Sequence, residues 1–285
     1  LALIIYNDFL FILISILIVR FFRIFIMIFI SINKIYWIEF SFKLFSFNEI
    51  NKLFIPSITF LFPPLIIILK SQALIFAIAY YFESSLITAF VLMLTLSRLL
   101  VPIGTLMANS LKIELNQLYS KGNKEYLLKI FFYHIQIVLY LLLVFYVFLL
   151  FFGNTIFNYW TINQVIFNKN IFLVLCTSSF LAAISGPIQL IIYGTNKHSL
   201  YSTYLFLLHL IIFVISLFMF KNFNLITAPM AIIVMELFTV IFAISFTAKI
   251  MNLSSFAILI NSIKLQKLKK LNLFSKLILN NYRKK

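Results

Sequence analysis

Seven long apolar segments separated by short polar gaps make up most of this chain, and they constrain its fold more than any other feature. A helix needs roughly 20 apolar residues to cross the hydrocarbon core of a bilayer. The segments that reach this length are Ile4–Ile30, Leu53–Tyr80, Ser85–Met107, Ile130–Phe152, Ile171–Tyr193, Tyr201–Phe220 and Leu225–Ile250. With 64% hydrophobic residues, the chain has too little polar surface to fold as a water-soluble globule. The sequence therefore predicts an all-α fold, a polytopic membrane bundle of about seven transmembrane helices.

Lysine and arginine are distributed unequally between the gaps. The first, third and fifth gaps and the C-terminal tail, counted from Lys249 at the end of the last span, together hold 17 of them, whereas the second, fourth and sixth gaps hold 2. Because cytoplasmic loops carry the excess of positive charge, the C-terminus is predicted to be cytoplasmic and the first residue to lie outside. This bias accounts for most of the net charge of +16, so a nucleic-acid partner is not expected. Anionic membrane lipids are the expected partner of the basic tail.

Two segments outside the spans have the composition of interfacial amphipathic helices, in which apolar side chains are mixed with lysine. The predicted division is therefore a first transmembrane helix at 1–30, a cytoplasmic amphipathic linker at 31–52, a six-helix lobe at 53–250 and a basic amphipathic tail at 251–285. None of these parts offers a soluble catalytic domain. The chain begins at Leu1 without the features of a signal peptide, which favours its being part of a longer protein.

Ionisable side chains inside the apolar segments are few, and each is costly in lipid unless it faces a cavity or a partner. The four that stand out are Lys70, Arg98, His209 and Glu236. Arg98 and Glu236 lie 13 and 11 residues from the predicted outer ends of their spans, so we expect them to face each other or a shared cavity. Two interpretations stay open, a satisfied ion pair that only fixes helix packing and a ligand-binding or ion-coupling site. For His209, a buried neutral imidazole hydrogen-bonded to a neighbour is favoured over a proton relay.

Other residues give weaker indications. Arg20 and Arg23 lie on one face of the first span and are candidates to line a cavity for an anionic group. The alternative, which we favour slightly, is that this span ends near Val19 and the arginines meet the inner headgroups. Cys176 is expected to be a packed thiol, and no metal site or cofactor is predicted. Proline residues inside the predicted spans are expected to bend them, whereas close helix packing through glycine is not expected, because the chain has only 5 glycines.

Several short motifs resemble those of the polysaccharide flippases, the O-antigen and teichoic-acid exporter branch of the multidrug/oligosaccharidyl-lipid/polysaccharide exporter superfamily. The stretches that carry the resemblance are Asn48–Leu74 with its polar break at Ser71–Gln72, Thr95–Leu99, Ile113–Glu114, Gly122–Lys124 and Tyr193–His198. The sequence departs from the family pattern at Ile113, where proline is frequent, at Asn123, where aspartate is frequent, and at Leu74, where an acidic residue is frequent.

The resemblance implies a function and a set of site residues. It makes the first span the last helix of an N-terminal lobe and the next six spans the C-terminal lobe of a multi-pass exporter in the cytoplasmic (inner) membrane of a bacterium. The implied activity is the movement of a polyprenyl-pyrophosphate-linked oligosaccharide across that membrane by alternating access, with Arg98, Lys70 and Gln72 as candidate substrate contacts. Polysaccharide polymerase machinery is a further implied partner.

Two other functions stay open at this point. One is a drug or cation antiporter of the same superfamily, in which Glu236 would be the coupling carboxylate. The other is a membrane-embedded glycan polymerase, which is less favoured because the predicted outer loops are nearly free of ionisable groups. We therefore expect a transporter rather than an enzyme.

Overall fold

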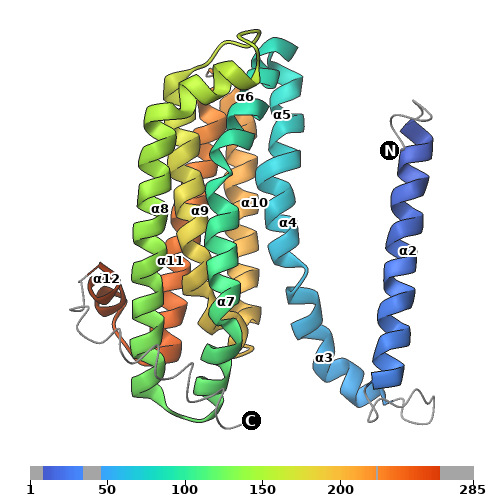
Figure 1. The fold of residues 1–285 in the computed structure, drawn as a ribbon, viewed down its shortest axis with the longest axis vertical. Helices are drawn as coiled ribbons and strands as arrows, with labels where there is room; N and C mark the ends of the chain where they lie inside the picture. The colour runs from blue at the N-terminus through green and yellow to red at the C-terminus, as the bar shows by residue number, and fades with distance from the viewer. Residues whose placement is uncertain (1–8, 35–45, 223, 264–285) are drawn as a thin grey trace. The chain divides into compact units, whose positions relative to one another are not determined.

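The computed structural model describes residues 9–34, 46–222 and 224–263 (Figure 1). Every element in these ranges is helical. The elements are α2 (Phe9–Lys34), α3 (Phe47–Thr59), α4 (Phe62–Ile68), the π-helix η2 (Leu69–Ala73), α5 (Leu74–Tyr81), α6 (Ser84–Ser97), α7 (Leu100–Ser120), α8 (Lys124–Trp160), α9 (Lys169–Gly194), α10 (His198–Asn222), α11 (Thr227–Met251) and α12 (Ser255–Ile263). The predicted all-α fold class is confirmed.

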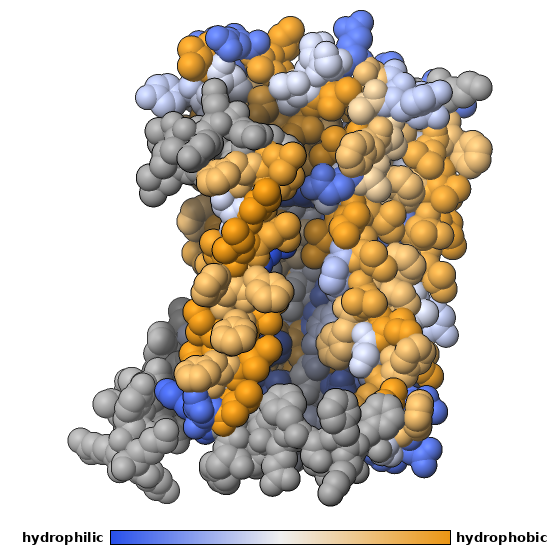
Figure 2. All heavy atoms as spheres, turned by 90° about the vertical axis from the view of Figure 1, so that its right-hand side faces the viewer, coloured by the Kyte–Doolittle hydropathy of each residue, from blue (hydrophilic) through white to orange (hydrophobic). Residues whose placement is uncertain are grey.

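Seven helical segments in the described ranges are long and apolar enough to cross a membrane, which confirms the predicted number of spans. Two of them are interrupted, since the segment Phe47–Tyr81 is built from α3, α4, η2 and α5, and Ser84–Ser120 is built from α6 and α7. Figure 2 shows hydrophobic side chains over the middle of the visible helices and hydrophilic ones towards their ends. This protein is therefore a multi-pass α-helical membrane protein.

The chain divides into two compact units, Leu1–Lys52 and Leu53–Lys285. In the first unit the apolar side chains described along α2 are almost all exposed. The linker residues 35–45 and the tail residues 264–285, for which amphipathic helices were predicted, lie outside the described residues.

The second unit is organised around α9, which packs against α6, α7, α8 and α11. Its core has two parts. One surrounds Leu74, Phe90 and Leu175, and the other surrounds Phe131, Ile191 and Tyr201. Helices α4, η2 and α5 pack against α10 at the edge of the bundle. Lys70 and Glu236 lie along the chain between residues of the first apolar core and residues of the second, and so away from the ends of their spans.

Small residues bring α7 and α9 into backbone contact. A Cβ added at Gly104 would overlap the backbone of Ala183, and a Cβ added at Gly186 would lie 4.0 Å from the methyl group of Ala108. Pro187 has no N–H to bond to the carbonyl of Ala183 one turn earlier, and this is the carbonyl that Gly104 accommodates. The expectation that glycine packing plays no part was wrong, because what matters is the spacing of small residues on facing helices and not the total number of glycines.

Candidate functional site

A cavity of about 360 Å³ lies within the second unit, a volume in the range of small-molecule sites. Side chains from α4, η2, α6, α7, α9, α10 and α11 line it, together with the residue that follows α6. The ionisable side chains in this lining are Lys70, Arg98, Tyr193 and Glu236. The cavity thus contains three of the four intramembrane charge-bearing residues singled out from the sequence, and it holds two cations against one carboxylate.

Lys70 reaches the cavity from the π-helix η2. The wider turn is closed by a hydrogen bond from the backbone N–H of Leu74 to the carbonyl of Leu69, five residues earlier. The hydroxyl of Ser71 donates to the carbonyl of Ile67 at 2.6 Å, which satisfies an acceptor in this irregular turn. A π-turn adds one residue to the helix and so rotates the side chains that follow it. Lys70 thus lies in the irregular turn of this segment and lines the cavity.

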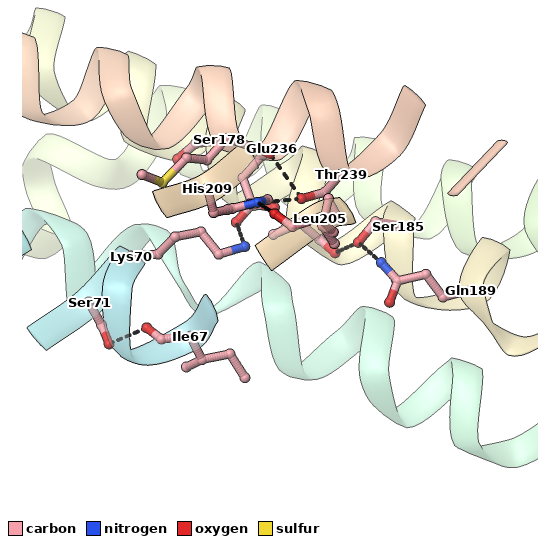
Figure 3. Close-up of polar contacts among 12 residues, drawn as sticks. Ile67, Lys70, Ser71, Ser178, Ser185, Gln189, Leu205, His209, Glu236 and Thr239 are labelled. Carbon is pink, nitrogen blue, oxygen red and sulfur yellow. Dashed lines mark hydrogen bonds and ion pairs between the residues drawn. The ribbon is translucent and has the colours of Figure 1, made fainter. Parts of the chain in front are cut away.

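Lys70 and Glu236 form an ion pair between η2 and α11 (Figure 3). The Lys70 ammonium donates to Glu236 Oε1 at 2.7 Å, and the two side chains are only 12% and 7% exposed. A pair so buried loses most of its hydration, so each charge depends on the other for stabilisation.

His209 lies beside this pair on α10 and is fully buried. Its Nδ1 lies 2.7 Å from the carbonyl oxygen of Leu205, so Nδ1 carries the hydrogen that is donated. Its Nε2 lies 3.2 Å from the hydroxyl of Thr239, which is also 2.9 Å from the carbonyl of Met235. The predicted burial and hydrogen bonding of His209 are confirmed.

Arg98 stands at the break between α6 and α7. Pro102, four residues later, lacks the N–H that would continue the helix to the Arg98 carbonyl, and this carbonyl accepts instead from Val101 at 3.0 Å. The half-buried Arg98 guanidinium lines the cavity and makes no hydrogen bond or ion pair with any residue in the described part of the chain. The nearby hydroxyl of Ser97 is bonded to Ser179 of α9 at 3.2 Å, which anchors this turn to the centre of the bundle.

The predicted shared cavity for Arg98 and Glu236 is confirmed, but the ion pair that it contains is a different one. Within the described residues, Glu236 pairs with Lys70, and Arg98 is left facing the cavity. Counting residues from the span ends placed the two groups at the right depth. This count could not show that Lys70, which lies in the π-helix η2, pairs with the carboxylate of Glu236.

Three predicted substrate contacts lie elsewhere. Gln72 is exposed on η2 and does not line the cavity, because it points away from the face that carries Lys70. Arg20 and Arg23 are exposed on α2 in the first unit. The cavity is lined only by residues of the second unit, so a role for these two arginines stays a prediction.

The sequence reasoning missed a polar stripe on α9. The α9 side chains that line the cavity include Ser178, Ala182, Ser185, Gln189 and Tyr193. Their spacing of three or four residues places them on one helical face. This spacing is readable in the sequence, but uncharged polar residues cost little in a membrane helix and so do not stand out from composition.

Comparison of this chain with protein-family models, with curated proteins and with solved structures found no match. The fold and the site together define the class of protein. It is a multi-pass helical membrane protein with a positively charged cavity inside its bundle.

Proposed function

We propose that this chain belongs to an exporter that moves a polyprenyl-pyrophosphate-linked oligosaccharide across the cytoplasmic membrane of a bacterium by alternating access. The observation that carries the proposal is the Arg98 guanidinium, which lines an intramembrane cavity and, among the described side chains, interacts with Glu236 only over a longer distance than a hydrogen bond or ion pair. The resemblance of the Thr95–Leu99 and Tyr193–His198 stretches to polysaccharide flippases supports the same assignment.

The charge of the cavity suits such a substrate. A pyrophosphate group that crosses the middle of a bilayer needs cations to replace its hydration, and a guanidinium offers two parallel donors to phosphate oxygens. Arg98 and Lys70 together exceed the charge of Glu236 by one, so the cavity is arranged to receive an anion. In this proposal Arg98 is the primary contact to the pyrophosphate. Lys70 is a second contact, which leaves its ion pair with Glu236 and binds the pyrophosphate instead. The C-terminus faces the cytoplasm, as the lysine distribution predicts.

The test is restoration of surface glycan in a bacterium that lacks its own polysaccharide flippase, using the gene that encodes this chain. We expect restoration by the wild type, loss with Arg98→Ala, and no loss with the control Lys129→Ala, which removes an exposed cation at the start of α8. Membrane levels of each variant are measured by immunoblot. Full restoration by a normally expressed double variant, Arg98→Ala with Lys70→Ala, would refute the role of these cations.

A second candidate is a drug or cation antiporter, and the buried carboxylate of Glu236 is the observation that favours it. A carboxylate in a cavity can exchange a proton or sodium ion for a cationic substrate. This candidate predicts that efflux of a cationic dye depends on an ion gradient and on Glu236, with no effect on surface glycan. Gradient-independent glycan export would reject it.

A further inference from the structure

The cavity has two ends of different chemistry. The charged end, formed by Lys70, Arg98 and Glu236, lies level with Ser178 and Ser179 on α9, since Ser97 bonds to Ser179. From Ser178 the polar face of α9 continues for fifteen residues to Tyr193, about 22 Å at 1.5 Å per residue. Apart from the tyrosine phenol, the lining along this stretch carries no ionisable group.

Gln189 presents unused hydrogen-bonding capacity in this second end (Figure 3). Its amide nitrogen donates to the hydroxyl of Ser185 at 3.1 Å, and that hydroxyl donates to the carbonyl of Ala182 at 2.8 Å. The Ser185 side chain therefore holds the amide in one orientation. The Gln189 carbonyl oxygen and the second amide hydrogen have no partner among the described residues, and the side chain lines the cavity. An acceptor and a donor on one rigid amide match a hydroxyl-bearing ligand.

Ser202 gives an independent indication from another helix. It lines the same cavity near the start of α10, and its buried hydroxyl lies within reach of the Tyr193 phenol. Two hydroxyl groups side by side in a cavity wall offer both donors and acceptors to a ligand. The ring of Tyr193 and the apolar side chains of Ile66 and Leu205 line the cavity as well. Polar groups combined with aromatic and apolar surfaces suit a pyranose, which has hydroxyl edges and apolar C–H faces.

We propose that Ser185, Gln189, Tyr193 and Ser202 form a subsite for a neutral sugar that is joined to the anion held at the charged end. Gln189 is the residue that determines its specificity. This inference rests on the proposed function, because the anion that precedes the sugar is the pyrophosphate of the lipid-linked substrate. It assigns sugar recognition to particular residues of α9 and α10, which the charges in the cavity do not do.

Binding is measured with the purified 285-residue chain in lipid nanodiscs. The probes are a polyprenyl pyrophosphate without sugar, the same lipid carrying one hexose, and a free oligosaccharide. For the wild type we expect the hexose to tighten binding about tenfold, as one or two additional hydrogen bonds would do. Gln189→Leu is expected to remove this gain and to change the Kd of the bare lipid less than twofold. Ser202→Ala, which deletes a single oxygen atom, is expected to remove part of the gain.

Gln117→Leu is the matched control, because Gln117 is exposed on α7 and does not line the cavity. It is expected to leave both affinities unchanged. Phosphatidylglycerol is added as a competitor, to separate a sugar subsite from a site for any polyol headgroup.

Each result decides between the two proposals. If the bare lipid binds but the hexose adds nothing, or if both cavity variants keep the gain, the sugar subsite is refuted and the proposed function stands. Loss of the hexose-dependent gain in the presence of equimolar phosphatidylglycerol, with binding of the bare lipid retained, would also refute the sugar subsite. If the bare lipid does not bind but the free oligosaccharide binds and loses affinity with Gln189→Leu, the lipid-linked substrate is refuted and the subsite stands. If none of the three probes binds, both proposals are refuted.

Discussion

The ion pair between Lys70 and Glu236 should behave as a coupled unit in stability measurements. At an N–O separation of 2.7 Å, the attraction of two unit charges is about 6 kcal/mol for an effective dielectric constant near 20. The cost of removing both groups from water offsets several kcal/mol of this attraction. We therefore expect about 2–3 kcal/mol of coupling free energy in a double-mutant cycle of Lys70→Met and Glu236→Gln.

The two single variants should differ from each other. Glu236→Gln leaves two cations, Lys70 and Arg98, in one cavity without a carboxylate and should lower the free energy of unfolding by about 3–4 kcal/mol. Lys70→Met leaves Glu236 in a cavity that still contains Arg98, so the loss should be nearer about 2–3 kcal/mol. The double variant should be destabilised by no more than the worse single variant.

Equilibrium unfolding in mixed micelles, followed by circular dichroism, measures these free energies. The exposed pair of Glu49 and Lys52 provides the control, since its side chains are 64% and 70% exposed at the same 2.7 Å separation. Removing either partner there should cost less than about 0.5 kcal/mol. If the losses of the two buried single variants add to within about 0.5 kcal/mol in the double variant, the reasoning about a coupled buried pair is refuted.

Three further predictions concern the fold. Gly104→Leu should destabilise the protein by more than about 2 kcal/mol, because the side chain would overlap the α9 backbone. Gly186→Ala should have little effect on stability, since its added Cβ would meet its nearest neighbour at 4.0 Å. Equal effects of the two variants in thermal unfolding would contradict the contact of Gly104 with α9. Asn168→Ala should cost about 1 kcal/mol, because its side chain accepts the first backbone N–H groups of α9, and the exposed Asn170→Ala provides the comparison in the same unfolding assay. The single Cys176 is fully buried, so maleimide labelling should be slow in the native protein and should accelerate only with unfolding; rapid labelling under native conditions would show that the core around α9 opens.

The candidate site was only partly predictable from the sequence. The cost of burying charge in lipid was enough to single out Lys70, Arg98, His209 and Glu236, and all except His209 line the cavity, with His209 buried beside it. The partner of Glu236 was not predictable, because depth along a helix does not determine which way a side chain faces. Gln72 illustrates the same limit, since it lies two residues from Lys70 and points away from the cavity.

The membrane environment, the number of spans and the residues too costly to leave in lipid were all predictable from the amino-acid sequence. These properties follow from local composition, because a bilayer imposes one thickness and one low dielectric on every segment that crosses it. Which of those residues meet became clear from the packed bundle. The π-turn at Leu69–Ala73 and the break before Pro102 interrupt two of the spans, and the contact of Gly104 with Ala183 joins α7 to α9. Contacts between segments distant in the chain, such as Lys70 with Glu236, depend on how the helices pack and not on the pattern of any one segment.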